Sequence, residues 1–131
     1  MFSEMGSASI LLVEDSEFIT QHVKNTLSSE HGFDVETVPT ASATRSILEE
    51  ETFDCVVTSY ELPDETGIEL AASVADGSRP PFVLLTGNPL EPLVEEALEA
   101  GVSAFVSKSN HATGSMEVFA NRLRLVIRAH S

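Results

Sequence analysis

The sequence predicts an α/β protein in which helices cover both faces of a five-stranded parallel sheet. Two observations carry this prediction. Five short apolar runs alternate along the chain with five segments whose apolar residues recur at helical spacing. The runs are nearly continuous in apolar residues, which is typical of strands buried on both faces of a parallel sheet. We expect one domain over residues 1–131, with a core from about 9 to 128, because a chain of this length can bury a core of its own.

The first strand is predicted over residues 8–13 and the first helix over residues 16–31. An acidic pair follows the apolar run of the strand. Ser16 can cap the helix, because its hydroxyl can accept a hydrogen bond from a backbone N–H of the first turn. Gly32 ends the helix. Four apolar residues of this segment recur at helical spacing: Phe18, Ile19, Val23 and Leu27.

The second strand is predicted over residues 33–38, and the helix after it begins at Thr40 or Ser42. That helix reaches the acidic run 49–51, which we interpret as a solvated helix end. The third strand follows over residues 53–59. It contains the single cysteine of the chain, which its apolar neighbours predict to be a buried structural thiol.

The remaining elements continue the alternation of strand and helix. Helices are predicted over residues 67–74, 90–100 and 115–128, and strands over residues 82–86 and 103–107. We expect the flavodoxin-like strand order 2-1-3-4-5, in which strands 1 and 3 are neighbours and a crevice lies at their carboxyl ends. This order brings together five polar residues that end strands or follow them: Glu14, Asp15, Ser59, Thr86 and Lys108.

These residue types suit a site for a hard cation and an anion. Adjacent carboxylates such as Glu14 and Asp15 can hold Mg²⁺, which prefers oxygen ligands. Lys108 can form an ion pair that relieves the repulsion between these acids. The Thr86 hydroxyl can donate a hydrogen bond to a phosphoryl oxygen. Taken one at a time, each residue is also compatible with an ordinary loop or strand position.

The ordered set of motifs resembles the receiver domains of response regulators from about Ser9 to Arg128. The motifs are the acidic pair, Tyr-Glu-Leu-Pro-x-x-x-Gly, Thr-Gly and Ala-Gly-Val-Ser-Ala-Phe-Val-Ser-Lys. The resemblance implies that Glu14, Asp15 and the backbone carbonyl of Glu61 hold Mg²⁺. It also implies a switch hydroxyl at Thr86, a switch aromatic at Phe105 and a phosphoryl-contacting lysine at Lys108.

Two positions depart from the receiver pattern. Ser59 stands where the family has the aspartate that accepts a phosphoryl group, and Ser109 stands where it usually has proline. A serine hydroxyl is a poor nucleophile unless a neighbour takes its proton, and it adds no charge to a metal site. We therefore expect a pseudo-receiver with weakened Mg²⁺ binding. Asp54 cannot replace the acceptor, because five residues of strand put it roughly 16 Å away.

The resemblance implies a function in protein-protein recognition. The expected partner is a histidine kinase, another receiver or an output domain, and the expected contact surface is formed by the last two helices and the strand between them. The alternative within the same family is a functional receiver that is phosphorylated at another residue, such as Glu61.

Composition narrows the classes of partner. The chain has 21 acidic and 7 basic residues, giving a formal net charge of -14. This balance disfavours binding to nucleic acids and to anionic membranes, because clustered Lys and Arg bind them. Without a signal peptide or a membrane-spanning run, we expect a cytoplasmic protein. The acidity favours solubility and also resembles the composition of proteins from halophilic archaea.

Two other classes of protein share part of this sequence pattern. A flavin- or nucleotide-binding protein needs an anion-friendly loop after the first strand, whereas Glu-Asp-Ser-Glu repels phosphate. A small hydrolase would use Ser59 in a nucleophile elbow, but the flanking glycines are missing. No pair of the four histidines has the spacing of metal ligands. We expect neither an enzyme nor an organic cofactor.

Overall fold

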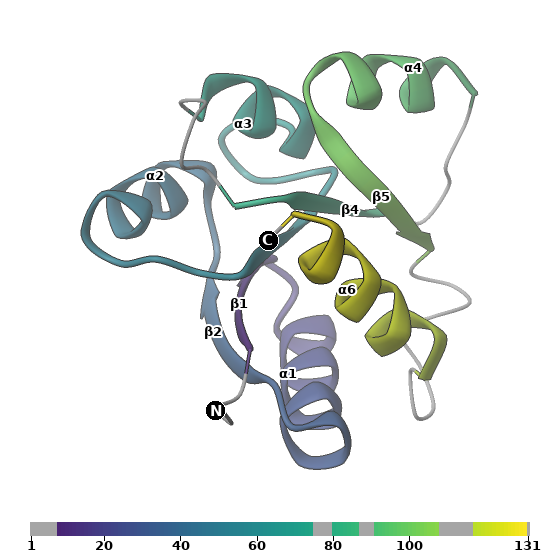
Figure 1. The fold of residues 1–131 in the computed structure, drawn as a ribbon. Helices are drawn as coiled ribbons and strands as arrows, with labels where there is room; N and C mark the ends of the chain where they lie inside the picture. Colours follow the sequence, from purple (N-terminus) through teal and green to yellow (C-terminus); the bar gives the residue numbers. More distant parts are fainter. Residues whose placement is uncertain (1–7, 75–79, 87–90, 108–116, 131) are drawn as a thin grey trace.

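The computed structural model describes residues 8–74, 80–86, 91–107 and 117–130 of the chain. Five parallel strands form one sheet in the order β2-β1-β3-β4-β5, which confirms the predicted topology (Figure 1). The strands are β1 (Ser9–Val13), β2 (Asp34–Val38), β3 (Cys55–Ser59), β4 (Phe82–Thr86) and β5 (Val102–Ser107). The described helices are α1 (Glu17–His31), α2 (Ala41–Glu50), α3 (Gly67–Ser73), α4 (Glu91–Glu99) and α6 (Glu117–His130).

Helices cover both faces of the sheet and bury a separate apolar cluster on each. On one face, α1 and α6 lie side by side over Leu12, Val57 and Leu85 (Figure 1). On the other face, α2, α3 and α4 cover a cluster that includes Val56 and Leu84. Successive residues of a strand therefore alternate between the two clusters, as the pleat of a strand requires.

Local signals set the ends of the helices where the sequence predicted them. The Ser16 hydroxyl accepts a hydrogen bond from Ile19 N at the start of α1, and Gly32 ends this helix with a φ of 73°. Thr40 caps α2 in the same way, through Ala43 N. Each of these hydroxyls satisfies one of the backbone N–H groups that a helix start leaves without a partner.

One of the four apolar residues recognised in α1 does not pack in the core. Val23 and Leu27 are buried and Ile19 packs against the same cluster, whereas the Phe18 side chain is 77% exposed. Phe18 has the helical spacing of the apolar face of α1. It lies at the margin of that face, however, where the sheet does not cover it in the described structure. Among the described residues, no helix is long and apolar enough to cross a membrane.

Candidate functional site

Strand register brings Glu14 and Ser59 together at the carboxyl edge of the sheet. Val13 of β1 is paired with Thr58 of β3, so the next residue on each strand falls at the same level. Both residues continue the series of alternate positions that pack under α1 and α6. A buried acid and a buried hydroxyl therefore meet where the topology predicts a ligand crevice: Glu14 is 4% exposed and Ser59 is 1% exposed.

Backbone contacts hold Glu14 in place. Its N–H donates to the carbonyl of Val38 at 3.0 Å, which continues the pairing of β1 with β2 beyond the strand end. Its carboxylate Oε2 accepts a hydrogen bond from Ser16 N at 2.8 Å. The carbonyl of Glu14 accepts from the Thr20 hydroxyl at 3.3 Å. The side chain is therefore fixed by the start of α1, whereas the neighbouring Asp15 is exposed.

The chain turns sharply after Ser59 and returns against it at Gly67. Gly67 N donates to the carbonyl of Tyr60 at 2.7 Å. A Cβ added at Gly67 would lie only 2.3 Å from the carbonyl oxygen of Ser59, so the first residue of α3 must lack a side chain. Between these points, Glu61 and Thr66 form an isolated antiparallel bridge. The loop after β3 is thus closed on itself.

Asp64, in the loop after β3, holds the start of α2. Its two carboxylate oxygens accept hydrogen bonds from Ala41 N and Ser42 N, each at 3.0 Å. These hydrogen bonds, with a smaller contribution from the charge of Arg45, hold the pKa of Asp64 below its ordinary value of 3.8. A carboxylate also suits the partial positive charge of a helix start.

Arg45 on α2 completes the connection between that helix and the loop. It forms an ion pair with Glu65 and donates to the Ser73 hydroxyl through Nε, at 3.0 Å, and Nη2, at 2.7 Å. No pattern in the sequence predicted these contacts. The loop Leu-Pro-Asp-Glu-Thr-Gly signals a turn but does not show which distant backbone groups its acids bind.

Thr86 and Phe105 are associated with the other face of the sheet. Thr86 ends β4 and is 5% exposed, and it continues the alternate series of Phe82 and Leu84. Phe105 is half-buried against the same cluster, and its carbonyl accepts a hydrogen bond from Arg122 Nη1 at 2.6 Å. The two proposed switch residues therefore share one side of the sheet, and Ser59 belongs to the other.

The remaining predicted site residues differ in how far the structure describes them. Lys108 and Ser109 lie outside the described residues. Glu61 is exposed in the loop after β3, and Asp54 is exposed at the opposite end of that strand. Asp54 Oδ2 accepts from Ser9 N at 2.7 Å, and Asp54 N donates to the Ser9 carbonyl at 2.8 Å. Asp54 is therefore a strand-start residue and not a member of the carboxyl-end site.

The donor set of the site offers little to a metal ion. Within the described residues there is no group of three or more His, Cys, Asp and Glu that could hold one. Glu14 and Asp15 supply carboxylates, but Ser59 supplies only a neutral hydroxyl, and one Glu14 oxygen already accepts from Ser16 N. Mg²⁺ can use two acids completed by backbone oxygen and water, so the two carboxylates are donors of the kind that the ion uses.

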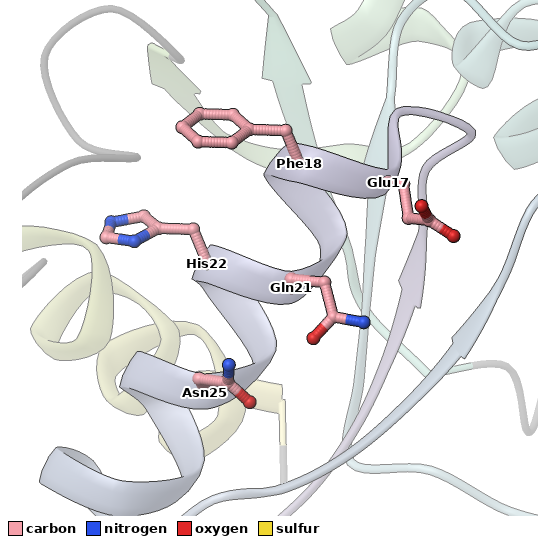
Figure 2. A pocket seen from close by; sticks show the side chains of 5 residues that line it. All are labelled: Glu17, Phe18, Gln21, His22 and Asn25. Carbon is pink, nitrogen blue, oxygen red and sulfur yellow. The ribbon is translucent and has the colours of Figure 1, made fainter.

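A hollow lies on the surface of α1, beginning at the first turn of this helix. Figure 2 shows Phe18 and His22 projecting from the same side of the helix, as residues four apart must. His22 Nε2 is buried and has no hydrogen-bond partner among the described residues. The hollow has a volume of about 470 Å³, and its lining residues are Glu17, Phe18, Gln21, His22 and Asn25.

Comparison with known proteins connects this arrangement to signalling domains. Residues 10–118 match the family model described as the response regulator receiver domain. The regulatory protein VirG of Agrobacterium fabrum is 31% identical over 119 residues, which make up 90% of this chain and 46% of that protein. The chain spans about half the length of the curated relatives it matches.

Two solved structures share the fold. The receiver domain of the Francisella response regulator 1452 has a TM-score of 0.83 at 17% identity and covers 95% of this chain and 100% of that one. The receiver domain of the sensor histidine kinase PA1611 from Pseudomonas aeruginosa has a magnesium ion coordinated in its active site cleft. It has a TM-score of 0.79 at 24% identity and covers 94% of this chain and 99% of that one.

Proposed function

The chain belongs to the response regulator receiver domain family, and we propose that it is a member that does not accept a phosphoryl group and acts by recognising a partner protein. The observation that carries this proposal is the side chain at the carboxyl end of β3. Ser59 lies there at the level of Glu14 and is almost fully buried, and the family pattern puts the acceptor carboxylate at this position.

An acceptor aspartate and a serine need different neighbours in order to react with phosphorus. A carboxylate attacks phosphorus without a base, whereas a serine hydroxyl must lose its proton to a neighbour. Glu14 is the nearest buried acid by register, and its Oε2 already accepts a hydrogen bond from Ser16 N. Phosphoryl transfer to Ser59 is therefore disfavoured even though the surrounding scaffold is intact.

The other residues of the family pattern keep a reduced role in this proposal. Glu14, Asp15 and the backbone carbonyl of Glu61 would hold Mg²⁺, which when bound neutralises charge on a phosphoryl group. Replacing a carboxylate by Ser59 removes one negative charge, so Mg²⁺ binds more weakly. Lys108, which lies outside the described residues, would offset the repulsion between the remaining acids.

Thr86 and Phe105 would still report the state of the site. In the proposal they form the switch hydroxyl and the switch aromatic of the receiver pattern, and a partner takes the place of the phosphoryl group in setting their positions. Their position on the α3 and α4 side of the sheet connects the site edge to the surface that a partner would contact.

The proposed contact surface is the face of α4, β5 and α6. Two large apolar side chains are exposed on its helices, Leu98 at 59% and Leu125 at 69%. The partner is a histidine kinase, another receiver or an output domain. The net charge of -14 argues that this domain itself does not contact nucleic acid. The same excess of acid suits a cytoplasm of high salt, where charge repulsion is screened.

Intact mass after incubation with acetyl phosphate and Mg²⁺ tests the proposal. We expect no gain for the natural protein or for Ser59→Ala, and a gain of one phosphoryl group for Ser59→Asp. This result would show a receiver site that lacks only its acceptor. A gain in the natural protein would overturn the proposal, and loss of that gain in Ser59→Ala would assign the modification to Ser59 instead of another residue.

A further inference from the structure

We propose that the groove between α3 and α4 binds an arginine-bearing segment of a partner protein. The two helices are neighbours on one face of the sheet (Figure 1). The groove between them has a volume of about 500 Å³ and belongs to neither the strand-end site nor the hollow on α1. The proposal rests on the proposed function in one respect: recognition without phosphorylation needs a surface that exists without a phosphoryl group.

The groove has an apolar interior. Ile68 and Ala72 of α3 line one side, and Ala100 lines the other just beyond the end of α4. Tyr60 is half-buried there and packs against the same apolar cluster as Ile68. An aliphatic side chain can lie along these residues and lose contact with water, and the face of an aromatic ring attracts a guanidinium group.

The rim of the groove is acidic. Glu69, Glu96 and Glu99 are exposed and line it, and none of them forms an ion pair within the described part of the chain. Glu69 is also held in position, because its Oε1 accepts a hydrogen bond from Thr66 N at 2.9 Å in the capping box of α3. The rim therefore presents three carboxylates from two helices, and at least one is fixed before any ligand arrives.

Charge and shape together select the occupant. Arginine has an aliphatic stem for the apolar interior and a planar guanidinium that can bind two carboxylate oxygens at once. An anionic ligand is repelled by the rim. A second copy of this chain is a poor occupant, because it brings 21 acids against 7 bases. A basic segment of a different protein remains the complementary partner, and the overall charge would speed its encounter.

A backbone-amide NMR titration of the full chain with a defined peptide tests this surface. The probe is Ac-Leu-Arg-Leu-Arg-amide, and its matched control carries citrulline, which has the shape of arginine without the charge. The rim variant is Glu96→Gln with Glu99→Gln. Glu30→Gln with Glu36→Gln removes two exposed charges from α1 and β2 and serves as the control variant.

We expect shifts confined to the groove, at Ile68, Glu69, Ala72 and Ala100, and an affinity that falls at least about threefold in the rim variant, as the loss of two exposed ion pairs predicts. The control variant should bind like the natural protein, and the citrulline peptide should bind more weakly than the arginine peptide. Equal weakening by both variants, or shifts spread over the acidic surface, would overturn the proposal. So would the absence of binding, or equal binding of the citrulline peptide.

Two further outcomes would distinguish a failure of this proposal from a failure of the proposed function. Shifts at the groove that grow with protein concentration, without peptide, would assign the surface to a second copy and overturn the proposal. A phosphoryl gain by the natural protein in the mass experiment would overturn the proposed function, and it would leave the peptide titration of the groove unchanged.

Discussion

Asp54 at the amino end of β3 and Ser59 at its carboxyl end differ in both charge and burial. Asp54 is an exposed carboxylate that accepts a hydrogen bond from Ser9 N, at the opposite edge of the sheet from the candidate site. Ser59 is a neutral hydroxyl with 1% exposure, next to Glu14. The strand therefore has a carboxylate at the edge of the sheet where no ligand crevice is predicted, and lacks one at the edge where the topology predicts the crevice.

The difference shows that the contacts supporting the carboxyl end of β3 form with a neutral side chain at its last residue. The loop after β3 is held by the close approach of Gly67 to the Ser59 carbonyl and by the hydrogen bonds of Asp64 to α2. In the proposed function, the side chain in front of this loop lacks the group that reacts. A scaffold retained without its acceptor is what a recognition domain needs.

The largest effect should come from breaking the support at the carboxyl end. In Gly67→Ala, the new Cβ would lie 2.3 Å from the Ser59 carbonyl and 3.0 Å from Cδ1 of Leu84, so the loop must move. We expect the free energy of unfolding to fall by about 2–3 kcal/mol, as overpacking costs. Urea unfolding measures it, with the exposed α2 substitution Ser46→Ala as a control that should stay within about 0.5 kcal/mol. Equal stability of Gly67→Ala and the natural protein would contradict the close approach.

Restoring the acid at the end of β3 should give the next largest effect. Ser59→Asp places a carboxylate in a buried position beside Glu14, so without Mg²⁺ we expect a loss of about 1–3 kcal/mol in the free energy of unfolding. Mg²⁺ at ten times its Kd should return about 1.4 kcal/mol to the variant. At the same concentration it should stabilise the natural protein less.

The matched control for this prediction is Ser59→Asn, which has a similar shape and no charge. Urea unfolding with and without Mg²⁺ compares the three proteins. An equal Mg²⁺ response of the natural protein and Ser59→Asp would show that Ser59 does not weaken the metal site.

A smaller, pH-dependent effect should follow from Asp64. Its pKa is lowered in the folded protein, first by the hydrogen bonds from Ala41 N and Ser42 N. A lowered pKa adds stability that is fully present above the unfolded pKa and is lost as pH falls through the folded pKa. The difference in urea midpoint between the natural protein and Asp64→Asn should therefore stay constant from about pH 7 to 5 and shrink below about pH 4. A difference in urea midpoint that grows in acid would contradict the lowered pKa of Asp64.

The last prediction concerns the rate at which the Cys55 thiol reacts and involves no change in stability. Cys55 lies next to Asp54 at the amino end of β3. Burial, and to a lesser extent the charge of Asp54, raises the pKa of its thiol to about 12. At pH 8 only about one thiol in 10,000 would then be the reactive thiolate. We expect no reaction with an aromatic disulfide reagent in buffer and rapid reaction in urea. Equal rates in the two conditions would show that the amino end of β3 is open to solvent.

The sequence predicted the elements whose signals are local. The apolar run before Glu14 predicted β1, and the hydroxyl of Ser16 and the flexibility of Gly32 predicted the ends of α1. The alternation of strands and helices then led to the strand order. Because parallel strands end at one edge, that order sufficed to gather Glu14 and Ser59 without any knowledge of side-chain contacts.

The sequence could not predict contacts between groups that are distant along the chain. Asp64 binds backbone groups of α2 that lie 22 and 23 residues earlier, and no pattern marks them as partners. Phe18 has the right spacing for the core of α1 and is nevertheless exposed, because coverage depends on where neighbouring elements lie. The groove between α3 and α4 also exists only where two helices from separate segments meet.

By itself, the sequence determined the receiver fold and the presence of a serine at the end of β3, because hydrophobic period, caps and the identity of one side chain are properties of short segments. Only the tertiary structure decided that Ser59 and Glu14 share one face of the sheet and that Asp64, from the loop after β3, holds the start of α2. It also decided that acids from α3 and α4 share one groove. These facts depend on strand register and helix packing, which are fixed when distant segments bury their apolar faces against each other.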